Sequence, residues 1–387
     1  MWKIRQFRYA NQEYVFYTPA IIFIILTVSL LYSSNFSSGW DHLYRQNPML
    51  LFPFIILIDQ ALFSQWLTTY FRYFVHAVAV ACLVTLFFYF IPSSLVVVIT
   101  EQLSFLKPYQ APEIQDAFGA YSPFLDRLHF GYMIGIACLV QLWLIFKYSF
   151  TWMQGLVFLT LGTTMLILGA RGAQIGLLLA LSVWVVWWTW SYLQLYSPNR
   201  HRSGLFISLS FVLLLIAPYL AYQYLPAVQT RYNQLIWEIQ TFYDGTYLRF
   251  SYTHFTSLRR ILSWQSMWEI VVQQPILGVG VGDYNDTLKT IYLKKHADFP
   301  PNTHQQFLFY WGASGLAGFL AFCTSFLVFL IHHLHANALP SKLLGVCFFV
   351  FFFVVFSLDT PLLYQAGSMS FWLFYLLLSL LRSKHTI

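Results

Sequence analysis

Charged residues are scarce in this chain. They make up 9% of its 387 residues, whereas hydrophobic residues make up 58%. Soluble domains carry roughly a quarter charged residues, so this composition excludes an ordinary soluble protein. The formal net charge of +7 is modest; it suits a chain that faces anionic lipid and does not indicate nucleic-acid binding. We therefore expect an all-α polytopic membrane protein.

Cysteine is also rare, and no residue pattern indicates a metal site. The four cysteines lie inside apolar runs, without the spacing of a disulfide framework or a zinc site, so we interpret them as small core residues: Cys82, Cys138, Cys323 and Cys347. The chain lacks the paired D-x-D aspartates typical of metal-dependent sugar-nucleotide enzymes, and Asp283 with Asp286 is a weak substitute. We expect neither a metal nor another cofactor.

Long apolar runs recur along the chain, each able to cross about 30 Å of hydrocarbon. The first follows a basic N-terminus without a signal-peptide cleavage site, so we interpret it as a retained span. We expect ten to twelve spans in a single integral membrane domain, residues 1–387. Ten runs lie near 16–33, 48–66, 72–91, 128–147, 151–169, 172–192, 204–224, 303–333, 342–358 and 366–382.

Lysine and arginine set the expected orientation. Placing the N-terminus in the cytoplasm puts most basic loop residues inside, in accordance with the positive-inside rule. Both termini are then cytoplasmic, and two long segments, about 92–127 and 225–302, lie on the periplasmic side. The second is rich in aromatic residues between Arg231 and Phe255, which could stack on sugars or anchor helices on the bilayer.

Within the 225–302 loop, a helical pattern runs from Ser257 to Gln274 and ends before Pro275. We expect one side of this helix to carry a mostly apolar row: Leu258, Ile261, Leu262, Gln265, Trp268 and Val272. A glycine-rich hinge follows at 278–282. It follows no predicted parallel strand, so a dinucleotide-binding fingerprint is not expected.

A histidine near the end of this loop is the first candidate for chemistry. Asn302 and Gln305 form a capping-box pattern that predicts a helix beginning at Thr303. His304 would then lie in the first turn, where free N–H groups attract anions and favour a neutral, basic imidazole. The alternative is an interfacial histidine that only caps the helix.

Glycines follow on the same predicted helix. Gly315 comes eleven residues after His304, close to three whole turns, so both would lie on one face. With Gly312 and Gly318, it would allow another helix to pack closely.

Arginines supply two further candidates. Arg171 lies in a glycine- and alanine-rich turn between two apolar spans, where a charged residue costs roughly 2.5–3.5 kcal/mol. Arg259 and Arg260 open the predicted helix at 257–274. Arg171 could instead be a snorkelling side chain at a helix end. Arg259 and Arg260 could instead lie on a solvated helix face. Together with a basic histidine, these guanidinium groups would suit a phosphorylated lipid.

At these residues the chain resembles the O-antigen ligase and polymerase superfamily of bacterial inner-membrane proteins, over about residues 125–335. The segment from Arg260 and Trp264 through Pro275 to the glycine hinge is similar to one family pattern. His304-Gln305, followed after nine residues by Gly315-x-x-Gly318, resembles the ligase signature. Arg171 in its small-residue turn is similar to a third pattern of the family, an arginine between two spans. The four-residue spacing to Trp264 favours Arg260 over Arg259 as the matching arginine.

The resemblance implies an inverting, metal-independent glycosyltransferase of the bacterial inner membrane. It would transfer O-antigen polysaccharide from undecaprenyl diphosphate to lipid A–core in the periplasm. His304 would act as the general base, Arg171 and Arg260 or Arg259 would bind the diphosphate, and Asn302, Gln305, Gly315 and Gly318 would support the site. Two alternatives remain open: an O-antigen polymerase that joins lipid-linked repeat units, and a transporter of lipid-linked glycans.

Overall fold

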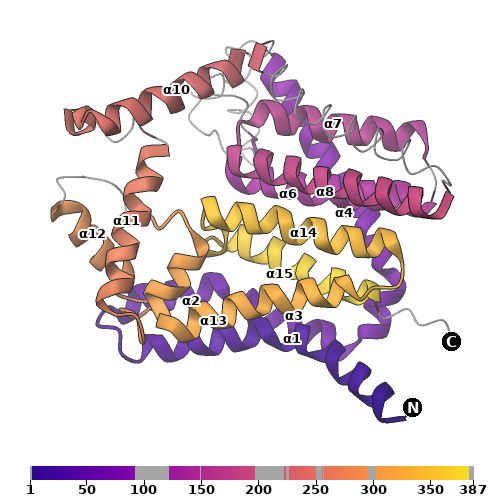
Figure 1. Ribbon diagram of the computed structural model, residues 1–387, viewed down its shortest axis with the longest axis horizontal. Helices are drawn as coiled ribbons and strands as arrows, with labels where there is room; N and C mark the ends of the chain where they lie inside the picture. Colours follow the sequence, from indigo (N-terminus) through magenta and orange to yellow (C-terminus); the bar gives the residue numbers. More distant parts are fainter. Residues whose placement is uncertain are drawn as a thin grey trace, which may run out of the picture. The chain divides into compact units, whose positions relative to one another are not determined.

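The computed structural model describes residues 2–91, 122–148, 150–196, 222–223, 226–249, 255, 257–294 and 302–382. The regular structure in these ranges is helical, which confirms the all-α class (Figure 1). Five helices are long and apolar enough to cross a membrane: α4 (Gln60–Phe90), α6 (Arg127–Tyr148), α8 (Arg171–Tyr196), α13 (Gln306–Leu334) and α14 (Leu339–Leu358). The chain is therefore a multi-pass membrane protein.

Shorter apolar helices account for other expected spans. They are the Tyr14–Leu30 part of α1 (Trp2–Leu30) and α7 (Trp152–Leu168). The expected span at 48–66 is wrong in extent, because the chain divides at Asp59 into α3 (Pro48–Ile58) and α4. The Asp59 carboxylate accepts the backbone N–H of Leu62 at 2.9 Å and so caps the start of α4. The expected span at 204–224 lies almost wholly outside the described residues.

The chain divides into two compact units. The first comprises residues 1–65, 235–336 and 355–387, and the second comprises 66–234 and 337–354. The expectation of one membrane domain over 1–387 stays a prediction.

Small residues allow close helix packing in the second unit. A Cβ on Gly131 of α6 would lie 2.8 Å from the Cβ of Ala170, and one on Gly176 of α8 would lie 2.9 Å from the carbonyl oxygen of Phe351. The Cys347 thiol donates to the carbonyl of Ala180 at 3.1 Å. Cys82, Cys138 and Cys347 are buried, as expected of core residues, whereas Cys323 of the first unit is only partly buried.

The described part of the 225–302 loop contains three α-helices, of which the last two lie in the first unit and the first begins in the second unit and ends in the first. They are α10 (Pro226–Tyr243), α11 (Ser257–Gln273) and α12 (Tyr284–Lys294), and α11 lies beside α12 in Figure 1. The helix predicted at 257–274 is thus confirmed. Its expected apolar row divides, however: Leu258 and Leu262 are buried in a core shared with α12, whereas Trp268 and Val272 are exposed.

A break inside α13 corrects the predicted helix geometry. Ser314 and Gly315 have non-helical dihedral angles, with φ of −127° and +66°, so Gly315 does not share a regular helical face with His304. The element that approaches the glycines is also not a helix. The turn after α11 lies against the break, where the N–H groups of Val279 and Gly280 donate to the carbonyls of Gly312 and Ala313 at 2.8 and 3.0 Å.

Glycine is required on both sides of this contact. A Cβ on Gly315 would lie 2.0 Å from the carbonyl oxygen of Ile276, and one on Gly278 would lie 2.6 Å from that of Gly312. Gly278 also has a positive φ of 70°. Gly318 packs against Ser314 of its own helix, whose Oγ would lie 1.9 Å from an added Cβ.

Candidate active site

His304 lies just before α13, not in its first turn. The helix begins at Gln306, and the Gln305 side chain caps it by accepting the N–H of Leu308 at 3.3 Å. Asn302 and Gln305 both resemble caps in the sequence, but only Gln305 caps α13. The prediction that free N–H groups of a first turn surround His304 is therefore wrong.

The backbone of His304 is unusual. Its φ of 46° is positive, and it is the one non-glycine residue with this property among those that the structure describes. Side chains larger than glycine adopt this region rarely, although histidine does so more often than most. Such strained positions cost about 1–3 kcal/mol and persist where the surroundings hold them.

Four neighbouring contacts hold the segment that carries His304. The Asn302 carboxamide oxygen accepts the His304 N–H and the Thr360 hydroxyl, each at 3.1 Å. The indole N–H of Trp264 donates to the His304 carbonyl at 2.9 Å. The Gln306 carboxamide oxygen accepts the N–H of Leu362 at 3.1 Å. The backbone that carries the imidazole is therefore fixed by α11 and by the segment that follows α14.

Asp359 brings two of the predicted residues, His304 and Arg260, together. It directly follows α14, and its Oδ1 lies 3.6 Å from His304 Nδ1 while its Oδ2 lies 3.7 Å from Arg260 Nη2. Burial raises the pKa of this carboxyl, but contact with His304 and the charge of Arg260 outweigh burial and lower the pKa to about 2. Asp359 is therefore ionised at any physiological pH.

Several polar atoms of Arg260 and of residues 303–306 lack hydrogen-bond partners in the part of the chain that the structure describes. Among the described residues, none bonds to the buried atoms Arg260 Nε, His304 Nδ1, Thr303 Oγ1 or Gln306 Nε2. Buried polar groups in native proteins are normally satisfied, so a cluster of unsatisfied ones calls for a ligand, an ion or water. All four are potential donors, which favours an acceptor-rich ligand such as a phosphate or a sugar.

The four-residue spacing from Arg260 to Trp264 has a structural reason. Both residues project from neighbouring turns of α11. Arg260 contacts Asp359, while Trp264 donates to the carbonyl of His304. Arg259 lies beside them and is partly buried, and its charge lowers the pKa of Tyr292, which burial nevertheless raises to about 12.

Arg171 belongs to the second unit. It is the first residue of α8 and is partly buried. Gly169, with a φ of 68°, ends α7 in a left-handed conformation, and the Gln174 amide donates to the carbonyls of Met165 and Leu166 at 2.9 and 3.1 Å. The predicted small-residue turn is thus confirmed, whereas a diphosphate-binding role for Arg171 stays a prediction.

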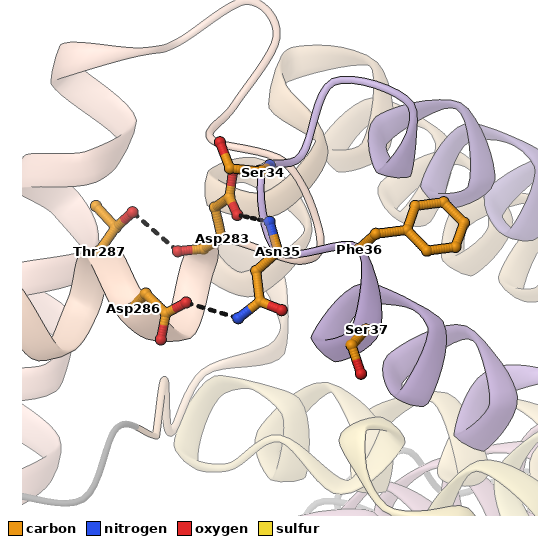
Figure 2. A pocket seen from close by; sticks show the side chains of 7 residues that line it. All are labelled: Ser34, Asn35, Phe36, Ser37, Asp283, Asp286 and Thr287. Carbon is orange, nitrogen blue, oxygen red and sulfur yellow. Dashed lines mark hydrogen bonds between the residues drawn. The ribbon is translucent and has the colours of Figure 1, made fainter.

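A shallow pocket of about 720 Å³ lies elsewhere in the first unit, between residues 34–37 and 283–287 (Figure 2). Its acidic residues anchor the turn after α1. Asp283 accepts the backbone N–H groups of Ser34 and Asn35, each at 2.7 Å, and Asp286 accepts the Asn35 amide at 2.9 Å. Asp283 and Asp286, a weak substitute for a metal-binding D-x-D pair, therefore accept hydrogen bonds from the turn after α1.

Sequence reasoning missed Asp359 as a member of the site. The available signal was an acidic residue placed directly after an apolar span, an environment that disfavours an unpaired charge. What the sequence did not show is that this carboxylate meets residues from α11 and from the start of α13.

A comparison with known protein families matches part of the chain. Residues 156–323 match the O-antigen ligase domain. This match confirms the resemblance over a segment that contains Arg171, Arg260 and His304, while Asp359 lies beyond it. No curated protein matches the chain. Over this segment the chain is thus similar to O-antigen ligases, which are glycosyltransferases that act on lipid-linked glycans.

Proposed function

We propose that this protein is an O-antigen ligase, an inverting glycosyltransferase that transfers polysaccharide from undecaprenyl diphosphate to lipid A–core. The observation that carries the proposal is the arrangement of His304 and Arg260 on the two oxygens of Asp359. One carboxylate thereby positions a base and a phosphate-binding cation side by side.

His304 is the general base in this mechanism. Asp359 faces Nδ1 and favours the tautomer with the proton on that atom, which leaves Nε2 to accept a proton. The separation of 3.6 Å exceeds a hydrogen bond by a small margin, as is common for catalytic pairs without substrate. Nε2 takes the proton of the acceptor hydroxyl as its oxygen attacks the anomeric carbon, and the bond from that carbon to the diphosphate oxygen breaks.

Arg260 stabilises the leaving diphosphate. Its guanidinium is only partly used by Asp359, since the contact measures 3.7 Å and Nε has no partner among the described residues. A planar guanidinium keeps its charge and can bind phosphate through two N–H groups. Diphosphate binding by Arg171 rests on the sequence resemblance and belongs to the same proposal.

Purified protein with defined substrates tests this function. Given an undecaprenyl-diphosphate-linked glycan and lipid A–core without ATP, the protein should form covalently glycosylated lipid A–core. A product formed only from two lipid-linked repeat units would instead identify a polymerase. Glycan uptake into vesicles without a covalent product would identify a transporter and contradict the proposal.

In cells, a chromosomal deletion gives an independent test. A ligase deletion should remove all attached O-antigen while lipid-linked polymer accumulates. Lipopolysaccharide carrying a single repeat unit would indicate a polymerase instead.

A further inference from the structure

Two basic side chains meet in the second unit, where α4 approaches the last turn of α6. The Arg72 guanidinium of α4 lies over the Tyr148 ring, with its Cζ 4.8 Å from the ring centroid. Lys147 Nζ lies 4.9 Å from the centroid of the same ring and 4.4 Å from that of Trp143. Both cations therefore share one aromatic ring, in an arrangement that favours positive charge over its faces.

Hydroxyl groups complete this cluster. The Lys147 ammonium donates to Thr68 Oγ1 at 3.4 Å, and the Tyr148 hydroxyl donates to the same oxygen at 3.2 Å. Thr68 precedes Arg72 by four residues on α4, so both project from one side of that helix. Aromatic rings and hydroxyls fix the positions of the two cations, but these partners are neutral and leave the positive charge uncompensated.

No carboxylate forms an ion pair with either cation in the part of the chain that the structure describes. Arg72 and Lys147 are both exposed, so a ligand from outside the protein can reach them. Two like charges held at one ring repel each other, and an anion placed between them removes this repulsion. The cluster therefore suits an anionic ligand.

The cluster lies at the level of the membrane surface. The membrane-spanning helix α6 ends at Tyr148, and the apolar helix α7 begins four residues later. Aromatic side chains are exposed at this turn, with 42% of Tyr148, 65% of Phe150 and 73% of Trp152 accessible. Such residues at the ends of spans lie among lipid headgroups. The positive-inside rule predicts that this turn faces the cytoplasm.

We infer that this basic cluster, formed by Thr68, Arg72, Trp143, Lys147 and Tyr148, binds the headgroup of an anionic phospholipid, with cardiolipin as the preferred ligand. A guanidinium can bind one phosphate through two N–H groups, while an ammonium binds another as a point charge. Basic pockets between membrane helices bind headgroups in this way. Cardiolipin carries two phosphates joined by one glycerol, one for each cation. The amine of a zwitterionic lipid would instead meet two positive charges.

Lipid titration of the delipidated full-length protein in a neutral detergent tests the inference, with native mass spectrometry as the readout. The wild type should bind cardiolipin more tightly than phosphatidylglycerol, which has one phosphate, and phosphatidylethanolamine most weakly. In Arg72→Gln/Lys147→Gln the dissociation constant for cardiolipin should rise about twentyfold, because each basic residue at an anionic lipid surface contributes about a factor of five. Affinity for phosphatidylethanolamine should stay that of the wild type.

The matched control is Lys289→Gln/Lys294→Gln on α12, which removes two exposed basic residues and so changes the net charge equally. It should bind cardiolipin like the wild type. A second variant, Arg72→Lys/Lys147→Arg, keeps both charges and should retain the preference for cardiolipin. Cardiolipin should raise the unfolding temperature of the wild type and the control but not that of the glutamine variant, whose lipid-free unfolding temperature verifies its folding.

Equal affinity of the wild type for cardiolipin and phosphatidylethanolamine would overturn the inference, as would an equal loss of cardiolipin binding in the α12 control. Wild-type affinity in Arg72→Gln/Lys147→Gln would exclude the cluster as the site. Inorganic phosphate should not displace cardiolipin, and full displacement at matched concentration would identify a free anion as the ligand instead. Because glycosyl transfer is not the readout, failure of this inference would leave the proposed function untouched.

Discussion

At the scale of single residues, the strained backbone of His304 and the buried charge of Asp359 depend on each other. The segment of Asn302 to Gln306 makes hydrogen bonds to α11 and to residues after α14, which compensate for a positive φ at His304. Strain of about 1–3 kcal/mol is retained most often where it positions a functional group. The same contacts place the imidazole beside Asp359.

Removing Arg260 alone should destabilise the protein more than removing both Arg260 and Asp359. Arg260→Ala leaves the buried Asp359 without its cation, which costs about 3 kcal/mol of folding free energy. The double variant Arg260→Ala/Asp359→Ala lacks both charges and should unfold at a higher temperature than Arg260→Ala alone. Thermal unfolding in detergent measures this coupling, and additive losses would show that the ion pair is unimportant. Neither variant should transfer glycan.

The planar shape of the Arg260 guanidinium should contribute to glycan transfer in addition to its charge. Arg260→Lys keeps a cation near Asp359, so stability should stay close to that of the wild type, but lysine cannot bind phosphate through two planar N–H groups. We expect the transfer rate to fall at least tenfold, measured with purified protein and saturating acceptor. Full activity would shift the diphosphate-binding role to Arg259, and Arg259→Lys is the matched comparison.

The charge of Asp359 should set the acid limb of the pH–rate profile. Its pKa of about 2 lies below the ordinary value near 3.9, so its contribution to stability is present above pH 4 and is lost only as pH falls through 2. Asp359 therefore stays charged throughout the pH range in which transfer is measured. In Asp359→Asn a nearby negative charge is lost, which disfavours the imidazolium, so the acid limb should move to lower pH as the maximal rate falls. An unchanged limb would contradict a positioning role for Asp359.

At the scale of elements, the break in α13 and the turn after α11 form one structure. Gly278 and Gly315 allow two backbones to approach so closely that a Cβ at either position would lie within 2.6 Å of backbone atoms. This contact joins α11, which carries Arg260 and Trp264, to the helix that follows His304. The glycines thus help to fix the distance between the base and the cation.

Gly315→Ala should accordingly be costly. Its φ of 66° and ψ of −163° are almost exclusive to glycine, and the new Cβ would clash with the carbonyl of Ile276. We expect a loss of several kcal/mol in stability and of most transfer activity. Gly162→Ala in α7 is the control, since nothing lies within 4 Å of an added Cβ there, and it should be neutral or slightly stabilising. Wild-type behaviour of Gly315→Ala would contradict the described contact.

Local sequence signals predicted some elements and misplaced others. The helix α11 was predictable because a helical pattern is ended by Pro275. The start of α13 was not, because Asn302 and Gln305 are both able to cap a helix, and the choice depends on Thr360 and Leu362, far along the chain. The break at Gly315 escaped detection because glycine is compatible with both a helix and a break. The role of Asp359 was not predictable because its partners, Arg260 and His304, are distant in sequence.

At the scale of the whole molecule, the orientation in the membrane decides whether the site can meet its substrates. Basic residues predict cytoplasmic termini and a periplasmic 225–302 loop. The expected donor and acceptor meet on the periplasmic side, so His304 must lie there. The helix α13 would then run inward from His304 to the loop that begins at His335.

Thiol labelling in intact cells tests this orientation. In a background without the four native cysteines, Asp244→Cys should react with a membrane-impermeant maleimide, because Asp244 is exposed in the 225–302 loop. Asn337→Cys, exposed between α13 and α14, should react only after the inner membrane is permeabilised. The reverse pattern would place His304 in the cytoplasm and exclude a periplasmic glycosyltransferase.

The most direct measurement is glycosyl transfer by purified His304→Ala protein, supplied with undecaprenyl-diphosphate-linked glycan and lipid A–core. General base catalysis contributes typically 10²–10⁴-fold, so the rate should fall by at least a hundredfold. Thermal unfolding should confirm that the variant remains folded, and its affinity for undecaprenyl diphosphate should be nearly unchanged. A folded His304→Ala protein that attaches O-antigen at the wild-type rate would contradict the assignment of His304 as the base.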